Sequence, residues 1–584
     1  MKRFNASLGK AWLAHCGLLL STALSLSACA PLFSGIPADP DAVLIMPVSG
    51  TGLFNYEIEV SSISRDVYFI FSASADKDTY AVPSATALSV DGETLPAPSA
   101  MKTPAVFGES ADKGQRIADF NRNPWSALGI AKAPSVPTAK LSSSNLGVPR
   151  ASYTEGDTGT LKDGPSSWDS TCRYVSDTPI GVAADGTPRR LIVWVEDDSW
   201  SYDPSNPKQY LVTQEMVNWL AGKFLASGAD NDVYDWLTAI LGPEWGATPY
   251  SNLIDFDGDI HIVLADIEDD DEPNGGIVGY FWSLNNFTNA YLAGTPYANL
   301  SNERIMFVLD SVMFANPVGG GDDAVWSTAD DWALEVYSTL AHEFQHMISF
   351  YQRSIVRDSD GADVWIDELC SMLAEDLLAE RMGVPGPRGV DPSDGSAGPS
   401  DNTEGRMPLF NRYSYFPLAV TSSYDVYDYS TTYAFGAWLA RNYGGASLLR
   451  SLVHTSASDE SIVETAASAG GAQPGDLDSL IARWAASVLY SDREDMPSGY
   501  RYNSGGWFSS TLDGNSYRLG SIDAFRYRRY GTAELGPFVF TANGPAGQGS
   551  ASSNVLFQAA HGFTGKRSFE INLPEGVRMY AVLK

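Results

Sequence analysis

The feature that most constrains this chain is a strongly helical segment, residues 330–348, which carries the pentad HEFQH at residues 342–346. Apolar side chains recur along it at steps of three and four residues, which is the periodicity of a helix. Positions i and i+4 share one helix face, so His342 and His346 can hold one zinc ion, with Glu343 beside a water on that ion. The chain has only six histidines, and two of them stand at this spacing.

The residues before this helix offer a start signal. Ser327, Thr328 and Asp330 could supply an N-cap oxygen, and Thr328 with Asp331 has the spacing of a capping box. The pentad alone occurs by chance in long sequences, but its place deep in a well-delimited helix favours a metal site.

A catalytic zinc site needs a third protein ligand. The metzincin pattern HExxHxxGxxH places a glycine and a third histidine at positions that hold Ser349 and Gln352 here, so the third ligand is not a histidine of that pattern. The next helical segment, residues 364–382, offers Glu368, which follows two apolar residues at the helix start, as a buried ligand requires. If it is not a ligand, Glu368 would cap or salt-link this helix. The other carboxylates there that could bind the metal are Asp367, Glu375 and Asp376.

Composition excludes one class of partner. The formal net charge is −33, and no Lys/Arg cluster is present, so nucleic acid is not an expected partner. Hydrophobic residues make up 44% and aromatic residues 12%, as in packed globular proteins. The acidity is consistent with an exported protein and with calcium binding.

The N-terminus predicts export. Lys2 and Arg3 precede an apolar stretch, residues 11–26, that is too short to span a bilayer as a mature helix. It ends in Leu-Ser-Ala before Cys29, which resembles the lipobox of bacterial lipoproteins. We therefore expect a lipid on Cys29 and a location in the bacterial cell envelope, at the outer membrane or the cell surface. Contact with the membrane is expected through the lipid anchor alone. The alternative is an ordinary secretory signal cleaved near an alanine.

The middle of the chain is read as strands followed by the pentad helix. Strands are expected at residues 191–195, 260–265, 275–284 and 305–309, and a helix at about 214–225. This order resembles the upper half of zincin metallopeptidases, a twisted sheet above the metal helix. The resemblance implies that an edge strand pairs with extended peptide substrate. Residues 275–284 are the candidate edge, and an ordinary hairpin arm is the alternative.

The predicted fold class is α+β multidomain, with a zincin-type catalytic domain between β-sandwich-like domains. Short alternating runs indicate β-structure near both ends. Helices are expected at 429–443 and 477–490 as a lower helical part. The expected units are a signal peptide (1–28), an N-terminal β-domain (29–105), a connector (106–185), the catalytic domain (186–495) and a C-terminal β-domain (496–584).

Over about residues 190–495 the chain resembles the hyicolysin family of zinc metallopeptidases (peptidase family M30), in the thermolysin-like gluzincin clan. The pentad with Met347-Ile348, the run WIDE at 365–368 and the run YSTTYAF at 429–435 carry this resemblance. It implies an endopeptidase that hydrolyses peptide bonds with zinc-activated water, with Glu343 as general base and protein or peptide as substrate.

Two points follow from the resemblance. Many gluzincins have an aspartate four residues after the ligand glutamate, which orients a histidine; Met372 stands there, so another residue must do this. Related enzymes also use a Tyr or His to stabilise the oxyanion. The candidates are Tyr433 and Tyr429, with His454 a weaker one and helix packing the alternative role for the tyrosines.

Two other groups of residues leave alternatives open. The acidic stretches 255–259 and 266–271 could bind structural calcium or form a solvated loop. Cys172 and Cys370 could form a disulfide or remain as buried thiols.

A function of another class is a surface-exposed binding lipoprotein or adhesin whose zincin domain is inactive. Inactive zincins commonly lose the base or a ligand. Here Glu343 and both histidines are present, which favours the enzyme.

Overall fold

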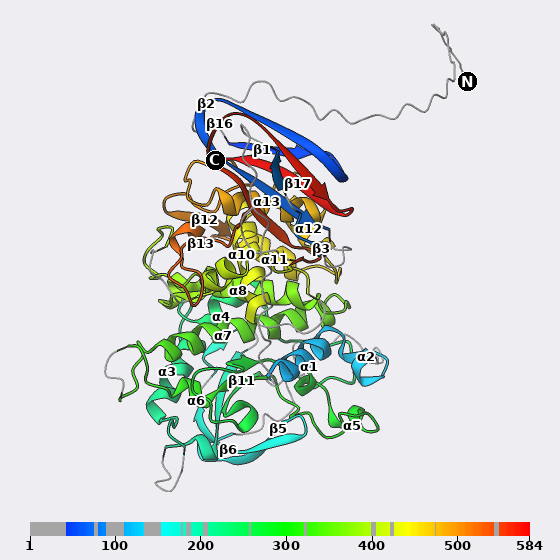
Figure 1. Cartoon of the computed structure of the whole chain (residues 1–584). Helices are drawn as coiled ribbons and strands as arrows, with labels where there is room; N and C mark the ends of the chain where they lie inside the picture. Colours follow the sequence, from blue (N-terminus) through cyan, green and yellow to red (C-terminus); the bar gives the residue numbers. More distant parts are fainter. Residues whose placement is uncertain are drawn as a thin grey trace, which may run out of the picture.

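The computed structural model stacks three tiers of structure (Figure 1). A sheet of strands from both ends of the chain lies at one end, helices lie in the middle, and a mixed sheet lies at the other end. The structure describes residues 43–584 except 75–79, 84, 89–109, 133–152, 177–178, 183–187, 202–207, 256–257, 321–323, 399–404, 421–425, 474 and 542–547. The predicted signal segment and Cys29 lie outside the described residues.

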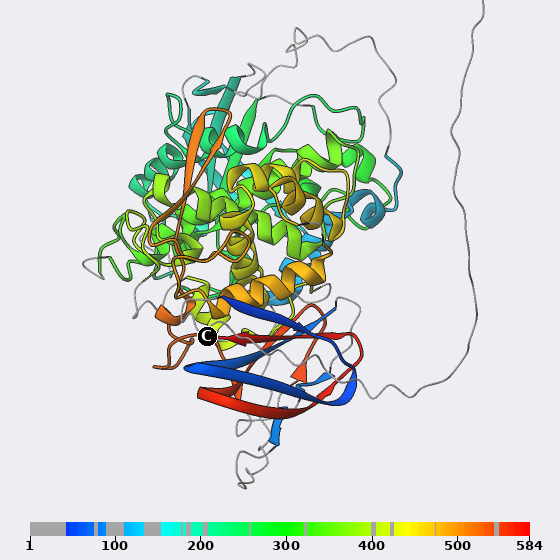
Figure 2. The ribbon, with the colours of Figure 1, turned by 90° about the horizontal axis from the view of Figure 1, so that it is seen from above.

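The first sheet joins the two ends of the chain, as Figure 2 shows from above. Its order is β1-β17-β2-β16-β14, with β4 also paired to β16. In the run YEIEV at residues 56–60, apolar side chains are buried and the two glutamates are exposed, which is the alternation of a sheet with one covered face. The strands are β1 (Leu44–Val48), β2 (Gly52–Ala73), β4 (Ala85–Leu88), β14 (Phe540–Thr541), β16 (Asn554–Leu573) and β17 (Val577–Leu583).

This sheet corrects the expectation of two separate β-domains. β2 pairs along its length with β16 and also with β17, so that Phe71, for example, lies opposite both Val555 and Met579. Strands from one end alone would leave unpaired edges, and the strands from the other end satisfy them. The alternation predicted the strands correctly, but not their partners.

The second sheet has the order β10-β11-β9-β8-β6-β5. Its central strands β8, β9 and β11 are parallel and almost wholly buried, as expected for strands covered on both faces. The short strand β10 pairs antiparallel with β11 and ends the order. The edge therefore lies within the predicted residues 275–284, but the strand is shorter than predicted and covers only Gly279 and Tyr280. The strands are β5 (Thr158–Asp163), β6 (Ser166–Val175), β8 (Pro188–Glu196), β9 (Asp259–Ala265), β10 (Gly279–Tyr280) and β11 (Met306–Asp310).

The segment expected to be a connector, residues 106–185, contributes to the fold. Strands β5 and β6 complete the second sheet, and helices α1 (Ser110–Arg122) and α2 (Pro124–Leu128) precede them. Leu161, Trp168 and Cys172 pack in one buried cluster with the neighbouring strand β8. Between these few large side chains the segment is rich in Ser, Thr, Gly and Asp. The alternation of polar and apolar residues that would predict strands is therefore weak in its sequence.

The helices follow the predicted periodicity closely. The pentad helix α7 spans Asp331–Ser349 and runs on as a π-helical turn, Phe350–Ile355. The next helix, α8, has the predicted bounds Val364–Met382 and ends at Gly383 in the left-handed region. The others are α3 (Gln214–Phe224), α4 (Val233–Leu241), α5 (Asn289–Leu292), α6 (Ser311–Phe314), α9 (Met407–Arg412), α10 (Val426–Asn442), α11 (Ala446–Val453), α12 (Ser461–Ala469) and α13 (Leu477–Leu489).

The start of α7 differs from the predicted capping box. Asp330 is the N-cap residue, but its carboxylate makes no hydrogen bond to the helix. Instead it accepts bonds from the backbone and hydroxyl of Ser327, at 2.7 and 2.8 Å. The short polar side chain closes the loop before the helix rather than capping the helix itself.

Short two-stranded pairs complete the fold. The hairpin of β12 (Trp507–Leu512) and β13 (Asn515–Gly520) stands apart from the terminal sheet, although it lies in the predicted C-terminal β-domain. The other short strands are β3 (Tyr80–Ala81) with β15 (Gln548–Gly549), and β7 (Gly181–Val182) on β8.

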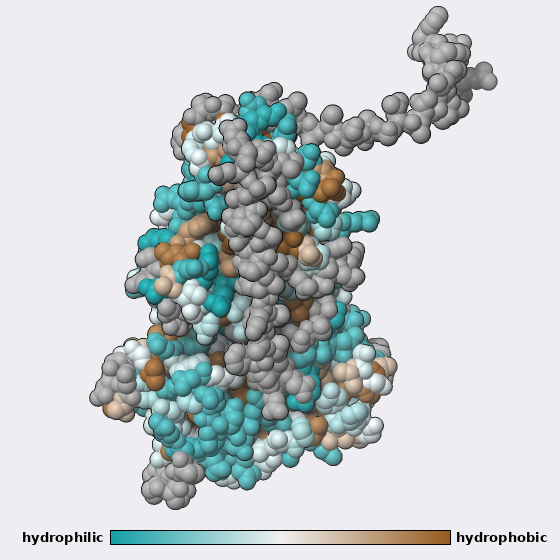
Figure 3. Space-filling model, viewed as in Figure 1, coloured by the Kyte–Doolittle hydropathy of each residue, from teal (hydrophilic) through white to brown (hydrophobic). Residues whose placement is uncertain are grey.

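Where Figure 3 draws the surface in colour, it is largely hydrophilic, with small, scattered hydrophobic areas. Within the described ranges, no helix combines the length and the apolar character needed to cross a bilayer.

Candidate metal centre

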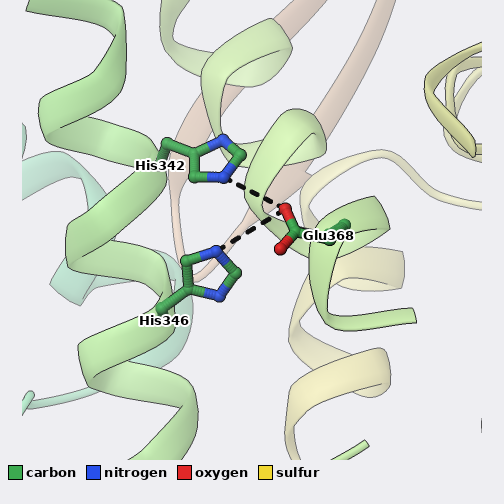
Figure 4. Close-up of side chains that lie close together, drawn as sticks. All are labelled: His342, His346 and Glu368. Carbon is green, nitrogen blue, oxygen red and sulfur yellow. Dashed lines mark hydrogen bonds and ion pairs between the residues drawn. The ribbon is translucent and has the colours of Figure 1, made fainter. Parts of the chain in front are cut away.

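Two helices of the core supply the candidate metal ligands. On α7, Phe344 packs against Phe224 at a ring separation of 5.0 Å and against Tyr234 at 5.5 Å. This apolar face fixes the rotation of the helix. His342 and His346, on another face, therefore point at α8, where Glu368 lies in the second turn (Figure 4).

The three side chains converge as one zinc ion would require. Nε2 of His342 lies 3.2 Å and Nε2 of His346 3.7 Å from the same Glu368 carboxylate oxygen. All three donor atoms lie within 4.8 Å of one another. Zinc bonds of about 2.0–2.2 Å hold neighbouring tetrahedral ligands roughly 3.3 Å apart. Small side-chain rotations would bring these donors onto one ion, so the set fits zinc.

Each histidine is oriented by its own carboxylate. Nδ1 of His342 lies 2.8 Å from Oε1 of Glu375, and Nδ1 of His346 lies 2.9 Å from Oδ2 of Asp367. The hydroxyl of Ser338 holds the other Glu375 oxygen at 2.5 Å. These bonds leave both Nε2 atoms for the metal, which is the usual outer support of a zinc histidine.

The pair of orienting carboxylates answers the question raised by Met372, which is itself fully buried. Glu375 stands two helical turns after Glu368 and so shares its face. From sequence alone, Asp367 and Glu375 are rivals of Glu368 as metal ligands. The spacing of seven residues between Glu368 and Glu375 is the signal that identifies Glu375 as a partner for a histidine. The third rival, Asp376, pairs instead with Arg441 at 3.0 Å.

The electrostatics favour a cation at this point. Burial disfavours a charged imidazole, but Glu368 and Glu375 outweigh it and raise the pKa of His342 to about 10. Burial likewise opposes the charge on His346, and Asp367 and Glu368 raise its pKa well above the usual value. Burial alone would raise the pKa of Glu368, yet the histidines hold it well below its ordinary range. The pocket thus stabilises positive charge, which protons supply when no metal is bound.

Glu343, the residue predicted to be the general base, lies beside the candidate ligands. It is 5% exposed and lines the same cavity as the three ligands. Burial raises the pKa of its carboxyl, and the two histidines and a hydrogen bond from the backbone N–H of Phe281 work against that rise. A carboxylate with a raised pKa is better matched to accept a proton near neutral pH.

A cavity of about 700 Å³ opens over the centre. The edge segment of the second sheet, residues 275–281, forms one side, and α7 and α8 form the floor. Helix α1 and residues 405–406 contribute further walls. This is a cleft of a size that takes several residues of an extended chain.

The cavity separates the oxyanion candidates. Tyr429 lines it, with its ring centre 6.4 Å from that of His342 and the Arg406 guanidinium 5.6 Å over the ring. Tyr433 is 1% exposed and does not line the cavity, and its hydroxyl donates to Asp376 at 3.2 Å. His454 lies elsewhere and donates from Nε2 to the carbonyl of Leu241 at 2.7 Å. The geometry favours Tyr429.

Two carboxylates of the acidic stretches are paired with basic side chains. Asp259 binds Arg190 at 2.9 Å, and Asp266 binds Lys208 and the amides of Asp270 and Asp271, both at 3.3 Å. These carboxylates need no calcium to balance their charge, and the described residues lend calcium no support.

The two cysteines that the structure describes are separate buried thiols, Cys172 in β6 and Cys370 in α8. Burial raises the pKa of both, that of Cys172 to about 12, so neither thiol is activated.

Comparison with known proteins identifies a family and a relative. The model of the peptidase M30 family matches residues 181–524, which is more than half of the chain. The neutral metalloprotease ShpI of Staphylococcus hyicus is 33% identical over 129 residues. That alignment covers 22% of this chain and 26% of the relative, so the chain matches about a quarter of the relative's length.

Proposed function

Because this chain belongs to the peptidase M30 family, we propose that it is a zinc-dependent endopeptidase. The observation that carries the proposal is the convergence of His342, His346 and Glu368 on one point in a cleft, with Glu343 beside them. Supporting it, Glu375 and Asp367 bind the far nitrogen of each histidine.

The chain's own residues would do the following in the reaction. A zinc ion, when bound, lowers the pKa of water and polarises a peptide carbonyl. Glu343 takes the proton from the attacking water and returns it to the leaving amine. The Phe281 N–H bond keeps the Glu343 carboxylate turned toward the cleft. The twisted sheet, edge strand and metal helix are consistent with a zincin-type catalytic domain.

Tyr429 is the proposed donor to the oxyanion of the tetrahedral intermediate. Its ring lies beside that of His342 in the cleft. The positive charge of the Arg406 guanidinium, which lies over the Tyr429 ring, would also stabilise the negative charge of the oxyanion. Tyr433 is buried against Asp376 and would act only through packing.

The substrate would be a protein or peptide in extended form. Hydrogen-bonded pairs alternate in an antiparallel ladder, and Asp310 N donates to Val278 O at 2.8 Å. The backbone groups of Gly279, one residue on, therefore point away from β11 toward the cleft. A peptide could pair with them and present one bond to Glu343.

Secretion and a lipid anchor on Cys29 complete the proposal. They rest on the sequence pattern at residues 1–29 and place the enzyme in the bacterial cell envelope. Mass spectrometry of the mature N-terminal peptide would find a diacylated or triacylated cysteine; an unmodified N-terminus beyond residue 29 would contradict this part.

The alternative is a surface-binding lipoprotein or adhesin with an inactive zincin domain. It would need a missing ligand or base, whereas His342, His346, Glu368 and Glu343 are all present and lie together. The observations therefore favour the enzyme.

The test is metal content and activity in one preparation. The purified protein should bind one zinc per chain and cleave casein, and a chelator should stop cleavage until zinc is restored. Glu343→Ala should retain zinc and lose about 10²–10⁴-fold in rate. Glu215→Ala, an exposed residue on α3, is the control and should change nothing. Undiminished cleavage by Glu343→Ala would refute the proposal.

A further inference from the structure

Helix α1 precedes the part of the chain matched by the family model, yet it reaches the edge of the cleft. Figure 1 draws it between α8 and the mixed sheet. It contributes Gly114, Gln115 and Asn121, among others, to the cavity lining.

At Phe281 and Ser283, backbone groups along the cleft-facing edge of the second sheet already have hydrogen-bond partners within the protein. By the alternation of the edge segment, Gly279 and Phe281 face away from β11, and Ser283 begins the 3-10 helix Ser283–Asn286 that follows. The Phe281 N–H donates to Glu343. Its carbonyl accepts from Nδ2 of Asn121 at 2.7 Å, and the Ser283 N–H donates to Oδ1 of Asn121 at 2.8 Å. One side-chain amide thus takes the acceptor and the donor that a paired strand would use.

Asn121 is held in place on both sides. The neighbouring Phe120 is 1% exposed and packs edge-on against Trp282 at 6.0 Å and Tyr297 at 5.0 Å. On the α8 side, Arg122 O accepts from Gly361 N at 2.6 Å and the Arg122 side chain pairs with Asp363. A segment tied to both halves of the cleft is a fixed wall rather than a lid.

The first turns of α1 are also tied to the edge. Lys113 binds Asp163 at 2.7 Å, and the other oxygen of Asp163 accepts from the hydroxyl of Tyr280, also at 2.7 Å. All three side chains are largely buried. The distance between α1 and strand β10 is therefore set at two points, by Asn121 and by this network.

We propose that Asn121 is a specificity-determining residue that caps the cleft-facing edge at Phe281 and Ser283, and so ends the main-chain pairing available to a bound peptide at Gly279. The proposal rests on the proposed endopeptidase function. A peptide that grows beyond the cap, on that side of the cleaved bond, finds no further backbone partner on this strand. On that side of the cleaved bond, only a few peptide residues contribute to binding. On the other side, a longer peptide can still bind more tightly.

The experiment uses two nested series of fluorogenic peptides around one cleaved bond, lengthened one residue at a time at either the N-terminal or the C-terminal end. With the unaltered protein, kcat/KM should reach a plateau early in one series only. Asn121→Ala and the polar variant Asn121→Ser should each uncover the edge and raise kcat/KM roughly five-fold for the next residue of that series, the size of one net hydrogen bond. The other series should not change.

The control is Asp119→Asn, an exposed residue of the same helix, which should behave as the unaltered protein. Variants that keep the same plateau, or that lose the same factor at every peptide length, would overturn the proposal. If the unaltered protein cleaved no peptide, the proposed function would fail. Binding of the same peptides, measured by fluorescence anisotropy, would still test whether Asn121 limits the pairing of a peptide with the edge strand. Tighter binding of the one series by Asn121→Ala supports it, and equal affinities overturn it.

Discussion

Removal of the Glu375 carboxylate should weaken zinc binding without unfolding the protein. Glu375 is 4% exposed and binds Nδ1 of His342 at 2.8 Å. In Glu375→Gln the amide oxygen can still accept from Nδ1 and its NH₂ can still meet the Ser338 hydroxyl, so the shape is kept and the charge is lost. In Glu375→Ala the imidazole loses its partner altogether.

The magnitude follows from that one bond. A hydrogen bond to a charged group contributes about 1.5–3 kcal/mol, and about 1.4 kcal/mol is a factor of ten in affinity. We expect zinc affinity to fall about 10-fold in Glu375→Gln and about 100-fold in Glu375→Ala, the range found for outer supports of zinc ligands. The pKa of His342, raised to about 10, would drop in both variants. Protons would then compete less with zinc, so the loss should be smaller at pH 7 than at pH 9.

The assay is competition for zinc with a chromophoric chelator at both pH values, with circular dichroism of the metal-free proteins to check the fold. Glu380→Gln is the control, because Glu380 lies on the same helix but pairs with Arg518 near the surface, at 2.9 Å. Zinc affinities within two-fold of the unaltered protein in Glu375→Ala, with the fold intact, would refute the assignment of Glu375 as the support of His342.

Three further outcomes are expected. Zinc binding at pH 7 should release about two protons, because the pKa values of His342 and His346 are both raised in the metal-free protein. Calorimetry in buffers of different ionisation enthalpy measures the number of protons released, and a value below one would contradict the prediction. Tyr429→Phe should lower kcat about 10²-fold with little change in KM, whereas Tyr433→Phe should cost only about 1 kcal/mol of stability; steady-state kinetics and thermal unfolding separate the two, and equal kcat losses would remove the distinction. Burial raises the pKa of Asp310 to about 7, so Asp310 binds a proton more tightly in the folded protein than in the unfolded chain, and its contribution to stability is complete below about pH 4 and is lost as pH rises through 7. In urea unfolding, Asp310→Asn should reduce the dependence of the free energy of unfolding on pH over this range. An unchanged pH dependence would contradict the prediction.

Much of the metal centre could be predicted from sequence. The histidine pair depends only on the covalent geometry of a helix, in which residues four apart share a face. The bounds of α8 and the position of Glu368 in its second turn follow from periodicity and from the glycine that ends the helix. The structure places Glu368 against both histidines, as the spacing indicated.

The partners of these ligands could not be predicted in the same way. Asp367 and Glu375 are carboxylates on the same helix as Glu368, but which carboxylate binds the metal and which binds a histidine depends on how α8 is rotated against α7. Tyr429 and Tyr433 are one turn apart on α10, and only packing decides that the first faces the cleft and the second faces Asp376.

The sequence by itself determined the main helices of the catalytic region, several of its central strands and which two imidazoles could share an ion, because those properties arise between residues close together along the chain. Only the tertiary structure decided that β2 pairs with β16 and β17, that β5 and β6 extend the second sheet, and that α1 reaches the cleft. Such pairings join residues up to several hundred positions apart. Any strand of suitable alternation could satisfy the same backbone groups, so the choice rests on the packing of the whole chain.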